Sequence, residues 1–229
     1  MNKISLYVLL ILIYLGISKS FSPSEKKTLY LANEKYYASL FRGAPISVVL
    51  KEYFSAGFLI KTYYHRYIII HAFKSPEEIV IRTSKEFWEQ NLRNKGMSLF
   101  RRGEREFKTS SIPMPPGSLF IGDPAYGTWD ITKYGAKVWK FHRTYKNFPT
   151  LFGWGEFRPT LDFYQRMKIF QSDSKPYYGP ESEFGTDGSI TDLEEEQELE
   201  DEHNLKEESI VDTLKSYFRI PKWEQKLDE

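Results

Sequence analysis

The longest apolar run in the chain covers residues 4–15, close to the N-terminus. Lys3 precedes the run, and small residues follow it up to Ser20, in the order typical of a secretory signal peptide. A bilayer span needs about 20 apolar residues, whereas a signal core needs about 7 to 15. We therefore expect residues 1–20 to be a signal peptide cleaved after Ser20. The alternative is an uncleaved anchor that keeps residues 4–17 in the membrane.

Two segments that follow show apolar residues near helical spacing. The first covers residues 23–43 and is closed by a glycine. The second covers residues 45–55, begins with a proline and is followed by a glycine, which is the usual asymmetry of helix ends. Both segments predict helices.

The pattern changes to that of strands from residue 58 onward. Residues 58–73 are rich in aromatic and β-branched side chains, and residues 78–83 continue this composition. A helix is predicted over 84–94. Residues 97–107 are basic and show no clear period, and the three prolines of 110–117 predict a rigid connection that would join two lobes.

Beyond the prolines, short strands separated by turn residues are predicted. We expect a strand over 118–121 and a hairpin formed by 126–131 and 136–145. Thr160 should cap a helix over 161–171. The predicted fold class is therefore α+β, with N-terminal helices and a strand pair, then an aromatic-rich antiparallel β unit, and a mostly disordered acidic tail.

The balanced net charge of +1 conceals two regions of opposite sign. Residues 21–189 hold 25 basic and 17 acidic side chains, whereas residues 190–229 hold 5 basic and 14 acidic ones. We therefore divide the chain into a basic body (21–189) and an acidic tail (190–229), with a short amphipathic helix predicted over 209–219. Such a tail is an interaction segment, a solvated disordered segment, or a segment that folds back on the basic body.

Composition excludes several classes of chemistry. The chain has no cysteine, so disulfides, thiolate metal sites and a catalytic cysteine are ruled out. The four histidines show no metal-ligand spacing, and no glycine-rich phosphate loop is present. We expect no metal and no cofactor. An exported chain without cysteine fits a bacterial periplasm or cell surface better than a disulfide-rich secretome.

The segment 117–159 is the richest in candidate chemistry, because it combines carboxylates with aromatic rings. Rings stack on the apolar faces of sugars and carboxylates accept hydrogen bonds from sugar hydroxyls. Two carboxylates about 5 to 9.5 Å apart can also hydrolyse a glycosidic bond, and a histidine can act as a general base. The candidate catalytic residues are Asp123, Asp130, His142 and Glu156.

The same segment supplies the candidate ligand-binding residues. These are Trp129, Trp139, Arg143, Trp154 and Arg158. The structural alternative is that the tryptophans belong to the core of a small β unit and the acids lie in turns.

Two clusters of basic residues predict a binding surface for a polyanion. The first cluster is Arg93, Lys95, Arg101, Arg102, Arg105 and Lys108. The second cluster is Lys133, Lys137, Lys140, Arg143 and Lys146. Because export removes the chain from nucleic acid, the expected partners are an envelope protein, an anionic polymer or lipid headgroups, with membrane contact only through residues 4–17 if they are not cleaved. The leading hypothesis is a non-catalytic binding or structural module of the cell envelope, and the alternative is an envelope glycan hydrolase.

Overall fold

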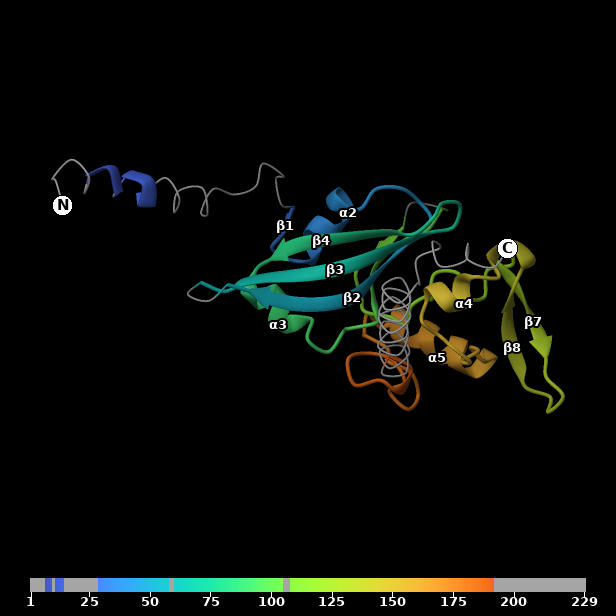
Figure 1. Cartoon of the computed structure of the whole chain (residues 1–229). Coiled ribbons are helices and arrows are strands. Elements are labelled where there is room, and N and C mark those ends of the chain that lie inside the picture. Colours follow the sequence, from blue (N-terminus) through green and yellow to red (C-terminus); the bar gives the residue numbers. More distant parts are fainter. Residues whose placement is uncertain (1–6, 10, 15–28, 58–59, 105–107, 192–229) are drawn as a thin grey trace, which may run out of the picture. The chain divides into compact units, whose positions relative to one another are not determined.

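The computed structural model describes part of the chain (Figure 1). The described residues are 7–9, 11–14, 29–57, 60–104 and 108–191. The predicted cleavage site after Ser20, the acidic tail beyond Thr191 and its predicted helix over 209–219 lie outside these ranges.

The chain separates into two units, Met1–Tyr30 and Leu31–Glu229. In the first unit, residues 7–9 and 11–14 are helical and exposed. Within the described ranges, no helix combines the length and the apolar character that crossing a membrane requires.

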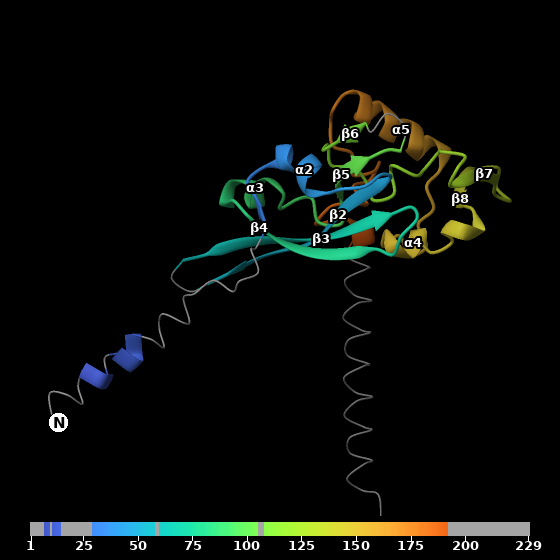
Figure 2. The same cartoon turned by 90° about the horizontal axis from the view of Figure 1, so that it is seen from above.

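The second unit contains a six-stranded sheet, in the strand order β1-β4-β3-β2-β5-β6 (Figures 1 and 2). The pairs β2–β3, β3–β4, β2–β5 and β5–β6 are antiparallel. The strands are β1 Tyr30–Leu31, β2 Ile46–Ala56, β3 Thr62–His71, β4 Glu77–Thr83, β5 Ser98–Arg102 and β6 Thr109–Ser110. A separate hairpin pairs β7, Gly127–Ile131, with β8, Lys137–Phe141. Together with the helices, these sheets confirm the predicted α+β class.

The helices are short, and most of them are single turns. They are η1 Glu34–Tyr36, α2 Tyr37–Leu40, α3 Lys85–Gln90, η2 Arg143–Tyr145, α4 Phe148–Leu151 and α5 Leu161–Ser172. Side chains cap three of them. Asn33 Oδ1 accepts from the Lys35 amide, Ser84 Oγ accepts from the Phe87 amide and Thr160 Oγ1, as expected, accepts from the Phe163 amide. Helix α5 therefore begins where the sequence predicts.

The helix predicted over 45–55 is wrong, because this segment is the central strand β2. It pairs with β3 along its whole length and with β5 over its first half. Both of its faces are buried near Val48 and Val49, which hides the alternation that normally marks a strand. The helix predicted over 23–43 is reduced, among the described residues, to the stretch 34–40. The short strand predicted over 118–121 is a turn.

The face of the sheet that α2 and α3 cover carries an aromatic cluster with a buried polar centre. The rings of Tyr37 and Phe41 lie 6.1 and 5.6 Å from the Tyr67 ring. His65 Nδ1 lies 2.8 Å from Tyr67 Oη, which lies 3.2 Å from Tyr37 Oη. His65 is fully buried, and burial lowers its pKa to about 4. This centre is therefore a neutral hydrogen-bonded chain within an apolar shell.

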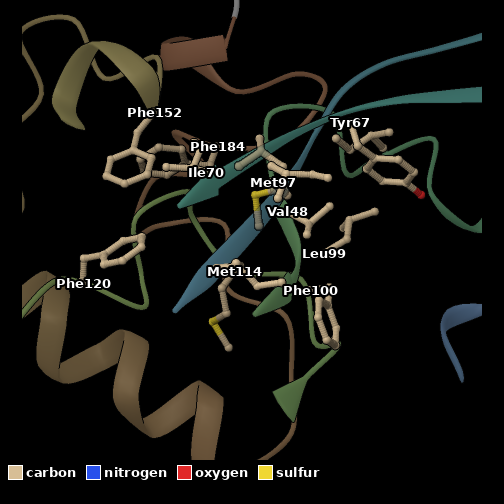
Figure 3. Close-up of a cluster of buried hydrophobic side chains, with 14 of the residues drawn as sticks. Val48, Tyr67, Ile70, Met97, Leu99, Phe100, Met114, Phe120, Phe152 and Phe184 are labelled. Atoms are coloured by element: carbon tan, nitrogen blue, oxygen red, sulfur yellow. The ribbon is translucent and has the colours of Figure 1, made fainter. Parts of the chain in front are cut away.

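A second aromatic cluster, built by residues 120–184, completes the core. Each ring of a continuous series lies within 6 Å of the next, centroid to centroid. The series is Phe120, Phe148, Phe152, Trp154, Phe157, Phe163 and Tyr177. Met97 and Met114 are fully buried in the same core, and Figure 3 shows them among the side chains of the sheet and of this cluster. The chain thus packs its many aromatic residues instead of using cross-links.

Strand β5 lies in the segment that the sequence left without a pattern, and two arginines hold it in place. Arg101 is buried and donates to the carbonyls of Ser98 and Ile112 at 2.8 and 2.7 Å. Arg102 donates to carbonyls of residues 38, 41 and 43 at 2.8 to 3.1 Å. The proline-containing stretch joins this arrangement, because Ser98 and Met114 form a backbone bridge. The division into two lobes near 110–117 stays a prediction.

Candidate functional site

The β7–β8 hairpin, which is labelled in Figure 1, carries basic and apolar side chains that are exposed to solvent. Its turn is closed by Thr132, whose backbone amide donates to the Ala136 carbonyl and whose Oγ1 accepts from the Ala136 amide. At the tip, Ile131 and Tyr134 are 70% and 98% exposed. Two large apolar side chains are therefore held out in water by a well-defined turn.

All five residues of the second basic cluster are exposed. Lys133 lies in the turn, Lys137 and Lys140 lie on β8, and the other two follow the strand. Lys140 pairs with Asp130 at 3.1 Å, and Asp130 is the single acidic residue between 127 and 146. We call Ile131, Lys133, Tyr134 and Lys137 the hairpin tip; it carries positive charge beside exposed apolar area.

Two tryptophans in the middle of the hairpin join it to the rest of the protein. Trp129 and Trp139 are partners in the β7–β8 register, with ring centroids 5.1 Å apart. Trp139 is buried, whereas Trp129 is half-buried. The Trp139 amide donates to the Pro159 carbonyl at 2.8 Å, which ties β8 to the start of α5.

Helix α5 places Tyr164 and Lys168 on one side, because residues four apart share a helix face. The Tyr164 ring lies 5.5 Å from the Trp129 ring, and Lys168 Nζ lies 5.5 Å from the centre of the Tyr164 ring. We call Trp129, Tyr164 and Lys168 the α5 row. It continues the hairpin surface as two half-buried rings that end at an ammonium group.

Glycine is needed where Tyr164 meets the turn before β7. Gly122 has φ +80°, and a Cβ atom at this position would lie 2.4 Å from Tyr164 Cζ. Asp123, the next residue, accepts the Ala125 amide with Oδ1 at 2.9 Å. Burial raises the pKa of Tyr164, and the negative charge of Asp123 adds to this rise. The turn therefore brings one carboxylate next to the α5 row.

Positive charge predominates around Lys168. Burial lowers the pKa of Lys168, and the charges of Arg101 and Lys108 lower it further, with Asp123 opposing them. The Arg101 guanidinium is bound by carbonyls and by Ser110 Oγ instead of a carboxylate, and burial lowers its pKa to about 9. Within the described part of the chain, no carboxylate lies within ion-pair distance of Lys168 Nζ. The region has an excess of cations over anions.

The candidate catalytic residues lie on separate elements. Asp123 is in the turn before β7, Asp130 is on β7 and paired with Lys140, and Glu156 is exposed in the loop after α4. His142 is exposed and its Nε2 lies 3.0 Å from the Pro124 carbonyl oxygen. The glycan hydrolase therefore stays a prediction, with Asp123 as the candidate acid that lies beside the α5 row.

The candidate ligand-binding residues divide into core and surface. Trp139 and Trp154 are 2% exposed, and Trp154 Nε1 donates to the Pro116 carbonyl. Arg158 donates to the carbonyls of its own loop at 2.7 and 2.8 Å, whereas Arg143 is exposed at the start of η2. Of the three candidate tryptophans, Trp129 is the one that lies in the α5 row.

The first basic cluster does not form one patch on the described surface. Arg101 and Arg102 direct their guanidinium groups at backbone carbonyls, as described above. Arg93 and Lys108 are exposed, and Arg105 lies outside the described residues. Two of its members are therefore structural cations.

The sequence does not indicate Tyr164 and Lys168 as site residues. Their spacing of four residues was visible, but the approach to Asp123 and Trp129 is a tertiary contact. Among the described residues, no group of three side chains is arranged to hold a metal ion.

Comparison of the chain with models of protein families, with curated proteins and with solved structures finds no match.

Proposed function

We propose that this protein is an exported, non-catalytic envelope protein that binds an anionic polymer through the hairpin tip and the basic residues beside it. The observation that carries the proposal is the exposure of Tyr134 and Ile131 next to Lys133 and Lys137 on a closed turn. Exposed basic and aromatic side chains together suit a polyanion, because the cations pair with acid groups and the rings contact the polymer backbone.

The charge of the hairpin region supports the proposal. Between residues 127 and 146 the chain carries five basic side chains against Asp130 alone. Solvent-exposed charges of this kind attract a polyanion over about 8 to 10 Å at physiological ionic strength. Association should therefore be fast and sensitive to salt.

The location is proposed from the N-terminal pattern. Residues 1–20 have the order of a secretory signal, so the polymers that the protein meets are those of an envelope and not nucleic acid. Fractionation of expressing cells and the intact mass of the recovered chain test this part. A chain of uncleaved mass in the cytosolic fraction would contradict it.

The binding proposal is tested with the triple variant K133Q/K137Q/K140Q. A basic residue near an anionic surface contributes about 1 kcal/mol, so loss of three should weaken binding roughly 100-fold. The matched control, K35Q/K61Q/K85Q, removes the same charge from exposed positions on η1, before β3 and on α3. Its affinity should stay within about threefold of the wild type.

The assay measures retention of the purified chain on immobilised acidic polysaccharide, on polyglutamate and on anionic phospholipid vesicles at low and high salt. Retention on a polymer, weakened by salt and by the hairpin variant, is the expected result. Retention on vesicles alone would replace the polymer with a membrane surface. Equal losses in the two triple variants would refute the hairpin as the site, and no retention anywhere would refute the function.

A further inference from the structure

The α5 row adds a chemical requirement to the proposed polymer, and the inference drawn from it rests on the proposed function. The rings of Trp129 and Tyr164 have centroids 5.5 Å apart and planes inclined at 58°, and Lys168 Nζ lies over the Tyr164 ring at 5.5 Å from its centroid. A sugar residue has an apolar face for a ring and hydroxyl groups for polar neighbours. The row therefore offers aromatic rings to the apolar face of a sugar unit and, beside them, an ammonium group to the acid group of the same unit.

The row is held rigidly. Gly122 lets the Tyr164 ring pack directly on the turn, and the Trp129 ring is supported by buried Trp139. Tyr164 and Lys168 both project from α5, the longest described helix, whose first turn is capped by Thr160. Side chains on capped, packed elements lose little freedom on binding, which favours affinity.

The cationic end of the row has no competing carboxylate in contact. Lys168 Nζ donates to the neutral Gln171 Oε1 at 3.3 Å, and the charges of Arg101 and Lys108 act on the same group. An acid group of a ligand would therefore gain attraction from Lys168 and Lys108 directly and from buried Arg101 behind them.

Asp123 gives the row a polarity. Its Oδ1 accepts the Ala125 amide, and its charge acts on both Tyr164 and Lys168. A carboxylate at this place repels a second acid group but accepts hydrogen bonds from sugar hydroxyls. The acid group of the ligand is thus directed toward Lys168 and Lys108, and the hydroxyls toward Asp123.

We infer that the polymer is an acidic polysaccharide, with a sugar ring packed against Trp129 and Tyr164 and its carboxylate or sulfate bound by Lys168. A polyanion without sugar rings would use only the cationic end. A neutral polysaccharide would use only the rings. The preference of the site is therefore for ring and charge in the same repeating unit.

The experiment compares the purified chain on polygalacturonate, on a sulfated polysaccharide, on polyglutamate matched in charge and on neutral amylose. We expect the wild type to bind both acidic polysaccharides about fivefold more tightly than polyglutamate, and to bind amylose weakly. Y164L and W129L, which keep apolar bulk without a wide flat ring, should lose this preference. Y164F keeps the ring and should retain the preference, and K168Q should weaken binding to every anionic polymer.

The outcomes separate the inference from the function beneath it. Equal affinity for polygalacturonate and polyglutamate, or an unchanged preference in both ring variants, overturns the acidic polysaccharide while leaving a polyanion-binding protein. Failure to bind any anionic polymer overturns the proposed function itself. Thermal unfolding of each variant, with Y164F as the folded reference, identifies a loss that comes from misfolding, and the preference is then read from the ring variant, Y164L or W129L, that stays folded.

Discussion

His65 should make the fold sensitive to acid between neutral pH and pH 5. The ring is fully buried on β3, with Tyr67 and Tyr37 as its polar neighbours and Phe87 against it at 5.6 Å. Neither tyrosine titrates in this range, because burial raises the pKa of both hydroxyls. A proton added to His65 would create a charge without a partner inside an apolar shell.

The direction of the effect follows from the two pKa values of His65. The unfolded chain binds a proton near pH 6.5, whereas the folded chain holds the pKa at about 4. Below pH 6.5, His65 is therefore protonated in the unfolded state but stays neutral in the folded state, and the free energy of unfolding falls until about pH 4. One pH unit corresponds to about 1.4 kcal/mol, so the loss from pH 7 to pH 5 is about 2 kcal/mol.

The test is urea unfolding at pH 7 and pH 5 for the wild type and for H65Q, which removes the titrating ring and keeps a hydrogen-bonding side chain. The stability advantage of the wild type over H65Q should shrink by about 2 kcal/mol on acidification. H142Q, at an exposed histidine, is the control and should follow the wild type. Equal acid-induced losses in the wild type and H65Q would refute a buried neutral histidine.

Two further predictions concern packing around the site and the sheet. R102M should lower the free energy of unfolding by about 2 kcal/mol, because three carbonyls of residues 38–43 lose a charged donor; R102K should recover only part, since an ammonium group does not span them. G122A should cost about 1 to 3 kcal/mol more than G135A in urea unfolding, because both glycines have φ near +80° but only Gly122 faces Tyr164. Similar losses in the two glycine variants would contradict the close approach.

The β7–β8 hairpin and α5 could be predicted from the sequence because their signals are local. Alternation of residue types flanks a glycine-containing turn at Gly135, and Thr160 supplies a cap directly before an amphipathic run. Strands β3 and β4 were found for the same reason, since their composition alone favours a pleated surface.

Strands β2 and β5 could not be predicted from the sequence, because tertiary contacts with other segments determine their strand conformation. Val48 and Val49 are buried on opposite faces, so β2 shows no alternation in its first half, and a proline at position 45 imitates a helix start. In β5, burial of Ser98 and Arg101 depends on partners that come from other segments. The α5 row could not be predicted either, because Trp129 and Tyr164 are 35 residues apart and meet only in the folded chain.

The hydrogen bonds from Arg102 to the carbonyls of residues 38–43 also determine the order in which parts of the fold can form during synthesis. Its three carbonyl partners lie 59, 61 and 64 residues earlier in the chain. The chain leaves the ribosome with its N-terminus first. Residues 38–43 therefore emerge well before Arg102, whose guanidinium binds their carbonyls in the folded protein. The first half of the domain can pair β2 with β3, yet its α2 end stays open until Arg102 arrives. A chaperone that binds the nascent chain would therefore encounter β2 and β3 already paired and the α2 end not yet closed.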